Sequence, residues 1–183
     1  KKYLSVCLDK ARQLEDLISE FFDIAKYSLS DVTLQYSRIN LTRLLEQLLY
    51  EFGPMLREKG LECGLCMEED VILNCDAGKM QRVFENLLRN AVAYSYQGTE
   101  IRILAQRRED CLSIRFENQG NTIPEEKLER IFEQFYRLDS ARGTGGAGLG
   151  LAIARQIITL HGGTITAKSE NQRTTFLITL PLL

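Results

Sequence analysis

The sequence lacks several features that would place it in a functional class at first sight. Lys and Arg total 23 against 25 Asp and Glu, and the net charge of −2 argues against a broad basic surface for nucleic acid. No apolar run approaches the roughly 20 residues of a membrane-spanning helix, and no signal peptide is recognisable. Histidine occurs once, as His161, at the end of a predicted helix, where a C-terminal capping role is expected.

Cysteine is present but does not form a metal-binding pattern. The five cysteines are odd in number, and the pair Cys63 and Cys66 invites comparison with metal or redox motifs. The alternating pattern around this pair predicts a strand, in which residues three apart point to opposite faces. No second cysteine pair or nearby histidine completes a site in the sequence. We therefore expect ordinary thiols in a reducing cytosol.

The composition is that of a soluble globular protein, with 44% hydrophobic and 26% charged residues among 183. This length allows one sizeable core, or one domain with an appendage. The sequence begins Lys-Lys-Tyr-Leu, without Met and inside a predicted helix. We therefore expect a fragment of a longer protein, and a membrane segment elsewhere in that protein stays open.

An amphipathic helix is predicted over residues 1–28. Apolar residues recur there at steps of four and three, which produces a narrow apolar seam. The seam residues are Leu4, Leu8, Ala11, Leu14, Ile18, Phe21 and Ala25. Such a helix packs either on its own domain or against another helix. We favour the second arrangement, because no partner helix precedes this one in the sequence.

The remaining sequence mixes strand and helix patterns and predicts an α/β fold, with a mixed sheet and helices on one face. Asn40 and Asp76 are expected to cap two of the helices, while Gly53 and Pro54 should break or kink the first of them. Strands are predicted at 32–39, 61–67, 71–75, 100–106, 111–117, 163–169 and 174–180. Helices are predicted at 41–59, 76–94, 124–136 and 149–161.

A glycine-rich segment, residues 143–150, leads directly into the last predicted helix, and five of its eight residues are glycine. Backbone N–H groups at a helix N-terminus bind anions, and glycine lets phosphate approach the backbone closely. The literal Gly-x-Gly-x-x-Gly match at 143–148 is weak, because a dinucleotide fold needs a strand before the glycines. A Walker A loop would end in Gly-Lys-Ser/Thr, whereas this one ends Gly-Leu-Gly-Leu. The segment therefore predicts a phosphate cradle of another kind.

Two asparagines lie on one face of the predicted helix 76–94. Asn86 and Asn90 recur at i and i+4, Tyr94 follows a further turn along, and the opposite face is apolar. Buried carboxamides need hydrogen-bond partners, so this pattern alone would indicate a solvated polar edge. Beside a phosphate loop it predicts a binding site, because an Asn oxygen can complete the shell of a phosphate-bound Mg²⁺.

Four segments, taken in order, resemble the ATP-binding domain of sensor histidine kinases. They are 86–94 as the N box, 118–124 as the G1 box, 131–137 as the F box and 146–150 as the G2 box. The resemblance covers about residues 40–183 and implies the Bergerat fold, an α/β two-layer sandwich. Residues 1–28 resemble the second helix of a dimerisation hairpin, which leaves 29–183 as the ATP-binding domain. Details of the N, G1 and G2 boxes resemble VanS-type vancomycin-resistance sensors.

The resemblance also implies site residues. Asn90 would bind Mg²⁺, Asn86 would lie beside the phosphates, and Arg137 would contact the γ-phosphate, with a solvated surface arginine as the alternative for Arg137. The implied nucleotide-binding residues are Asn86, Asn90, Tyr94, Asn118, Gly120, Ile123, Tyr136, Arg137, Gly146, Gly148, Leu149 and Gly150, and those implied to be catalytic are Arg137 and Asn86. Residues 138–145 would form a mobile lid, hinged at Gly143 and Gly145.

Three positions depart from the family pattern. Asn118 stands where Asp usually accepts a hydrogen bond from adenine, which predicts ATP binding weaker by on the order of 1 kcal/mol. Thr122 replaces a glycine of the G1 box, so the turn there is expected to be tighter or shifted. Ala93 stands in place of a common lysine, which removes one cation near the phosphates. The arginines that could compensate are Arg89, Arg137 and Arg142.

The resemblance implies a protein-histidine kinase with ATP and Mg²⁺ as cofactors. Asn86 occupies the position of the water-activating Glu of ATP-hydrolysing relatives, which favours phosphoryl transfer to a protein side chain. The acceptor histidine would lie on a dimerisation helix absent from this sequence, so this fragment should not phosphorylate itself. The implied partners are ATP, a response regulator and a second copy of the intact protein, with no nucleic acid. That protein would be a membrane-anchored bacterial sensor, and this part of it would be cytoplasmic.

Two other functions stay open at this point. A degenerate module could hold ADP or nothing and act through helix pairing, mainly in response-regulator dephosphorylation, and the changes at Asn118 and Ala93 keep that alternative in view. An anti-sigma-type kinase, which phosphorylates a Ser of its partner, is the third candidate. The leading helix argues against it, because such kinases lack a preceding dimerisation hairpin.

Overall fold

The computed structural model describes residues 33–68, 70–138 and 147–182, together with scattered positions between residues 3 and 22. Five strands form the main sheet in the order β2-β4-β5-β7-β6. Their bounds are β2 (Glu62–Cys66), β4 (Glu100–Arg107), β5 (Cys111–Gln119), β6 (Thr164–Glu170) and β7 (Arg173–Pro181). The β2–β4 pair is parallel and the other pairs are antiparallel, so the sheet is mixed as predicted.

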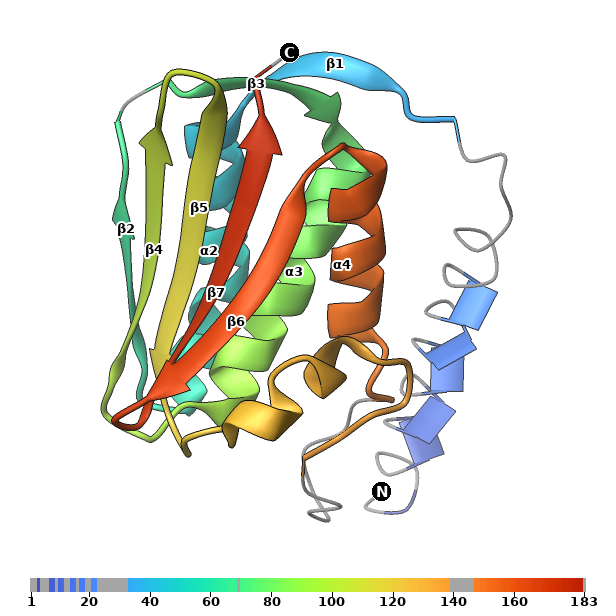
Figure 1. The fold of residues 1–183 in the computed structure, drawn as a ribbon. Helices are drawn as coiled ribbons and strands as arrows, with labels where there is room; N and C mark the ends of the chain where they lie inside the picture. Colours follow the sequence, from blue (N-terminus) through green and yellow to red (C-terminus); the bar gives the residue numbers. More distant parts are fainter. Residues whose placement is uncertain are drawn as a thin grey trace.

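Three helices cover one face of this sheet (Figure 1). They are α2 (Leu41–Glu58), α3 (Ala77–Tyr94) and α4 (Gly150–Leu160). Strand β5 shows why the two layers form: Leu112, Ile114 and Phe116 are buried, whereas Ser113 and Arg115 alternate with them toward solvent. The apolar stripes of the helices pack on these buried positions. The predicted two-layer α/β sandwich, with helices on one face, is therefore confirmed.

A second, two-stranded sheet lies apart from the first. Strand β1 (Tyr36–Asn40) pairs antiparallel with β3 (Ile72–Asp76). In Figure 1 this pair runs across the upper end of the helices, where α3 begins. The sequence patterns located both strands but did not distinguish this small sheet from the main one, because pairing depends on contacts distant in the chain.

Both predicted helix caps are present. The Asn40 side-chain oxygen accepts a hydrogen bond from the Arg43 N–H at the start of α2, 3.1 Å away. Asp76 accepts one from the Lys79 N–H at the start of α3, also over 3.1 Å. Pro54 lies inside α2, which continues to Glu58, so a break there is wrong, whereas a kink at Pro54 stays a prediction.

The predicted helix at 124–136 is also wrong. Two short 3₁₀ turns replace it, η1 (Glu125–Lys127) and η2 (Arg130–Phe132). Glu133 is extended, with ψ 146°, and Phe135 has a φ of 63°, so the chain cannot continue as a helix beyond η2. Two aromatic side chains of this segment have different surroundings: Phe132 packs edge-on against Phe176 in the core, whereas Phe135 is 59% exposed.

The N-terminal segment is helical at every position that the structure describes between residues 3 and 22. Several apolar side chains there are exposed, among them Leu8, Leu14, Leu17, Ile18, Phe21 and Phe22. Across the described part of the chain, no helix has the length and apolar content needed to span a membrane.

Candidate functional site

The centre of the site is the contact between α3 and the first residue of α4. Asn86, buried on α3, donates a hydrogen bond from its side-chain Nδ2 to the backbone carbonyl of Gly150, 3.0 Å away. The two helices run side by side in Figure 1. The amide therefore ties the predicted N box to the end of the glycine-rich segment, although the two lie far apart in the sequence.

Asn90 lies one turn further along α3 and is half-buried. Within the ranges that the structure describes, its side chain makes no hydrogen bond, so both arms of the amide are available to a ligand. Tyr94 follows at the end of α3 and is 45% exposed. The apolar face of the same helix, including Val83 and Leu87, is fully buried. The sequence pattern therefore identified the correct polar and apolar faces of α3.

The glycine-rich segment is described only from Ala147 onward. Gly146, the lid residues 139–145 and the hinge glycines within them lie outside the described residues, as does Arg142. Gly148 has a φ of 74°, and a Cβ there would lie 2.9 Å from the carbonyl oxygen of Tyr136. Its own carbonyl accepts a hydrogen bond from the Phe135 N–H over 3.0 Å. Glycine at 148 thus permits close packing between the glycine segment and the F box.

The start of α4 presents backbone rather than side chains. Leu149 is fully buried in the core, so only its main chain can face a ligand. Gly150 packs against Asn86, and a Cβ at that position would meet the Asn86 side chain at 3.4–3.6 Å. The first backbone N–H groups of α4 have no intrahelical acceptor, and they carry the positive end of the helix dipole.

A second polar region lies at the end of β5. Asn118 is only 4% exposed and is paired in register with Thr174 of β7, which is 5% exposed. Gly120 follows in the same turn, and a Cβ there would lie 2.1 Å from the carbonyl oxygen of Tyr94. Only glycine fits at that position. The G1 segment and the end of α3 are therefore in direct backbone contact.

Hydroxyl groups on β6 and β7 complete this region. Ser169 accepts a hydrogen bond from the Ile123 N–H over 2.9 Å, and its hydroxyl lies 2.9 Å from that of Thr174. Thr122 accepts one from the Gln172 N–H over 3.0 Å, so the residue in place of glycine anchors the G1 turn to the β6–β7 turn. The sequence patterns missed Ser169 and Thr174. The available signal was a polar residue at 174, at an inward position of β7 where the alternate residues are apolar.

Three cationic side chains near the candidate site each contact other protein groups. The Arg89 guanidinium lies 5.8 Å from the centre of the Phe52 ring on α2, which favours an interaction with that helix rather than with phosphate. Arg130 stacks over Tyr136 at 4.4 Å. Lys59 donates hydrogen bonds to the carbonyl oxygens of Val92 and Ala93, at 2.9 and 3.3 Å, and so stabilises the C-terminal end of α3.

Arg137 is half-buried at the end of the F box, adjacent to Tyr136, whose backbone packs on the glycine segment.

Cys63 lies half-buried on β2 and Cys66 is exposed at its end. Burial, with a smaller contribution from the Glu100 carboxylate, raises the pKa of Cys63 to about 12, which favours the protonated thiol over the nucleophilic thiolate. No cluster of three or more His, Cys, Asp or Glu suited to a metal occurs among the described residues.

His161 is buried at the end of α4, and both ring nitrogens are hydrogen-bonded. Nε2 must accept from the Asp76 backbone N–H, 3.0 Å away, so Nδ1 carries the proton and donates to the Ile157 carbonyl over 2.8 Å. The expected capping role at the helix end is therefore present.

Burial alone would raise the pKa of Asp76, but hydrogen bonds from Lys79 and from the Gln35 backbone lower it to about 2.

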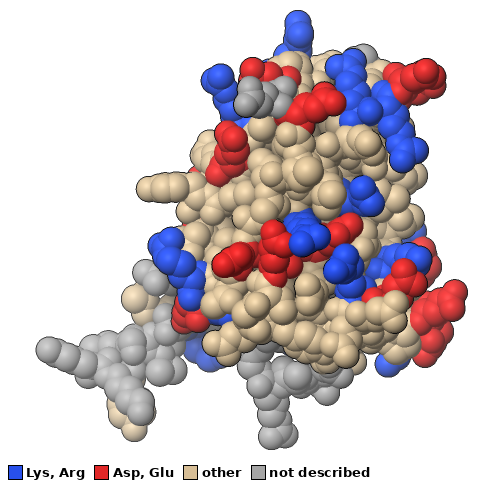
Figure 2. All heavy atoms as spheres, turned by 90° about the vertical axis from the view of Figure 1, so that its left-hand side faces the viewer, with Lys and Arg blue, Asp and Glu red and all other residues tan. Residues whose placement is uncertain are grey.

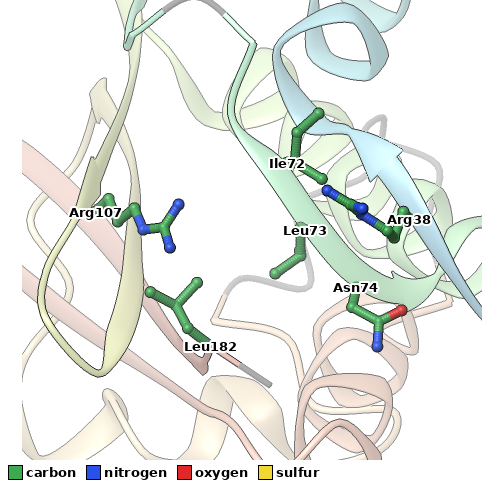
Figure 3. A pocket seen from close by; sticks show the side chains of 6 residues that line it. All are labelled: Arg38, Ile72, Leu73, Asn74, Arg107 and Leu182. Atoms are coloured by element: carbon green, nitrogen blue, oxygen red, sulfur yellow. The ribbon is translucent and has the colours of Figure 1, made fainter.

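A separate pocket of about 320 Å³ lies between the small sheet and the end of β4. Figure 3 shows that Arg38 and Arg107 approach it from opposite sides, with the apolar side chains of Leu73 and Leu182 between them. It lies at the end of the molecule where β1 and β3 cross the helices, whereas α4 begins at the other end (Figure 1). None of the predicted site residues lines it.

The uncovered face of the sheet carries charges of both signs. Arg102 pairs with Glu100 at 2.6 Å, and Glu117 lies 3.9 Å from both Arg115 and Arg173. Figure 2 shows acidic and basic side chains intermixed on this side, separated by wide areas of other residues. This face therefore presents no continuous field of one sign.

Comparison with known proteins assigns the chain to a family. The sequence profile of the histidine kinase-, DNA gyrase B-, and HSP90-like ATPases matches residues 75–183, from the end of β3 through β7. The chain belongs to this family, which confirms the resemblance seen in the four sequence boxes.

The individual relatives are sensor proteins. The sensor protein VanS of Enterococcus faecium is 48% identical over 184 residues, which cover 100% of this chain and 48% of that protein. The sensor protein VanSC of Enterococcus gallinarum is 44% identical over 182 residues, covering 98% of this chain and 50% of that protein. The predicted likeness to VanS-type sensors is therefore confirmed, and the chain spans about half the length of these relatives.

A solved structure shows the same architecture. The histidine kinase ThkA, determined in complex with the response regulator protein TrrA, superposes with a TM-score of 0.81 at 25% identity. The superposition covers 100% of this chain and 51% of that one.

Proposed function

We propose that this chain binds Mg-ATP and transfers its γ-phosphoryl group to a histidine outside the chain. The observation that carries the proposal is the Asn86–Gly150 hydrogen bond, because it brings the amide face of α3 to the first residue of α4. Asn90, with an unused amide, lies on that face one turn along. Amide oxygen and helix N-terminal N–H groups are together suited to a nucleotide phosphate with its cation.

Asn90 is the proposed Mg²⁺ ligand, through its side-chain oxygen. When bound, Mg²⁺ would neutralise charge on the phosphate oxygens. The phosphates would lie against Gly148 and the N-terminus of α4, and Arg137 is proposed to contact the γ-phosphate. At the other end of the bound nucleotide, Asn118 and Gly120 would face the base, and Tyr94 would lie beside it.

Transfer to a protein is favoured over hydrolysis, because no carboxylate on the amide face of α3 can activate water. An amide has no basic site, and the Nδ2 of Asn86 already donates to Gly150. Glu85, the neighbouring carboxylate, accepts a hydrogen bond from Gln81 over 2.8 Å. Transfer to a side chain then requires chiefly positioning and charge stabilisation from these residues.

The proposed acceptor is a histidine on a dimerisation hairpin. His161 is unsuited, because it is buried and both its nitrogens are engaged. We propose that residues 1–28 are the second helix of that hairpin and that 29–183 form the ATP-binding domain, and the exposed apolar side chains between Leu8 and Phe22 support this division. The intact protein would be a homodimer and a membrane-anchored bacterial sensor, with this domain in the cytoplasm. It would pass the phosphoryl group to an Asp of a response regulator, as the ThkA–TrrA complex suggests.

Phosphotransfer in trans tests the proposal. The chain is mixed with a VanS-type dimerisation hairpin that carries the acceptor histidine, together with labelled Mg-ATP, and acid-labile phosphate on the hairpin is measured. We expect transfer by the wild type, its loss in Asn90→Ala, and full transfer by the control Asn74→Ala, an exposed asparagine in the distant pocket. ATP binding without transfer would favour the degenerate module instead.

A further inference from the structure

We infer that Asn118 makes this site accept 6-oxopurine nucleotides, those of guanine and hypoxanthine, as well as ATP. The inference rests on the proposed function, because it assumes that a purine base lies at the end of β5. It adds a base specificity that the family assignment does not contain.

The position of the Asn118 side chain carries the first step. The residue is 4% exposed, at the end of β5, and its strand partner is the buried Thr174. A Cβ on Gly120 would lie 3.6 Å from Asn118 Nδ2, so the amide borders the space left open by that glycine. A side chain buried this deeply has few positions available to it, and a base in this region would meet its amide directly.

The amide is also unused, unlike its neighbours. In the part of the chain that the structure describes, the Asn118 side chain makes no hydrogen bond, whereas Ser169, Thr174 and Thr122 are all hydrogen-bonded. The amide atoms of Asn118 keep some contact with solvent. Among the described residues, no atom of Asn118 is both fully enclosed and without a hydrogen-bond partner. An amide left without protein partners at such a site has its full hydrogen-bonding capacity available for a ligand.

The chemistry of an amide then sets the specificity. A carboxamide presents one acceptor and one donor arm, and rotation by 180° about its terminal torsion exchanges them. Adenine offers an N6 amino donor and an N1 acceptor, whereas a 6-oxopurine offers an O6 acceptor and an N1–H donor. Each base edge matches one of the two amide orientations. Because no hydrogen bond from the described residues fixes the Asn118 amide, neither orientation is excluded.

A carboxylate at the same position would discriminate strongly. It is an acceptor only. Where it faces the 6-substituent, it pairs with the adenine amino group, whereas against a 6-oxopurine it meets O6 and can reach the N1–H donor only if the base shifts within the site. A buried polar group left without a partner lowers affinity by roughly fivefold to 150-fold. Asn118 removes that penalty for the 6-oxo bases.

Calorimetric titration of the chain with the Mg²⁺ complexes of ATP, GTP and ITP tests the inference. ITP has the 6-oxo edge but lacks the 2-amino group, so it separates recognition of that edge from steric exclusion at C2. For the wild type we expect ITP to bind within about tenfold of ATP, with GTP equal to ITP or weaker. For Asn118→Asp we expect the ratio of ATP to ITP affinity to rise by roughly fivefold or more. Asn121→Asp is the matched control, because it adds the same charge in the same turn at an exposed residue, and it should leave the ratio unchanged.

The possible outcomes separate this inference from the proposed function. ATP binding with ITP weaker by a hundredfold or more in the wild type would overturn the inference alone, whether or not Asn118→Asp folds. An unchanged ratio in a folded Asn118→Asp variant would also overturn it. Binding of none of the three nucleotides would overturn the proposed function and this inference together.

Discussion

The side-chain amide of Asn86 donates a hydrogen bond to the backbone carbonyl of Gly150 across 3.0 Å, joining α3 to the first residue of α4. Asn86→Asp replaces this donor by a charged acceptor, which repels the carbonyl it faces. Loss of a buried hydrogen bond with such repulsion should lower the free energy of unfolding by roughly 1–3 kcal/mol. Urea denaturation measures the change. Asn74→Asp, at an exposed position of β3, is the control and should change stability by less than about 0.5 kcal/mol. Equal effects of the two substitutions would show that the bond does not contribute to stability.

A methyl group at position 120 cannot be accommodated. A Cβ there would lie 2.1 Å from the carbonyl oxygen of Tyr94, and that atom belongs to backbone, which cannot turn aside. Gly120→Ala should therefore destabilise the fold by about 2 kcal/mol or more, measured as a lower thermal midpoint.

Gly78→Ala is the matched control for that substitution. Position 78 lies in the first turn of α3, and its nearest contact would be an ordinary 3.9 Å to Asp76 Oδ1. Alanine in a helix should be neutral or stabilising by up to about 1 kcal/mol. Similar midpoints for the two variants would contradict the packing described for the G1 segment.

The Asp76 cap predicts a pH dependence of stability. Its pKa is lowered from 3.8 to about 2, because hydrogen bonds from Lys79 and from the Gln35 backbone outweigh the effect of burial. A lowered folded-state pKa means that the stabilisation is complete above the unfolded-state value and declines as pH falls from about 4 toward 2. The stability difference between the wild type and Asp76→Asn should therefore shrink over this range. A difference that stays constant between pH 5 and pH 2 would refute this role for the carboxylate.

Lys59 is predicted to stabilise the C-terminal end of α3. Its ammonium group donates to the carbonyl oxygens of Val92 and Ala93. Lys59→Met keeps the aliphatic stem but removes both hydrogen bonds, and it should cost about 1 kcal/mol in unfolding experiments. Lys168→Met, which breaks an exposed pair with Glu170, should cost less than about 0.5 kcal/mol. The reverse order of the two losses would contradict the assignment.

Local features of the fold could be predicted from the sequence because their causes are local. Asn40 and Asp76 precede periodic apolar runs and bond to N–H groups three residues away, which is the geometry that such residues favour. The two faces of α3 follow from a period of 3.6 residues. The same periodicity places Asn86 and Asn90 on one face of α3, and it does so without reference to α4, the helix that Asn86 contacts.

The features that could not be predicted depend on distant contacts or on unusual backbone conformations. The 3₁₀ turns end at Phe132 because Glu133 is extended, and Phe135 then adopts a positive φ, which phenylalanine rarely does and which no periodicity indicates. Thr174 joins the candidate site through the register of β5 and β7, which brings it opposite Asn118. The bond between His161 and the Asp76 backbone joins residues 85 positions apart.

The most direct test of the central claim is the Mg²⁺ dependence of ATP binding, measured by calorimetry with and without the cation. If Asn90 holds Mg²⁺ beside the phosphates, the wild type and Asn74→Ala should bind ATP more tightly when Mg²⁺ is present. Asn90→Ala should lose most of that enhancement while remaining folded, because its half-buried amide has no partner among the described residues. Absence of ATP binding by the wild type, or an undiminished Mg²⁺ enhancement in Asn90→Ala, would contradict the account.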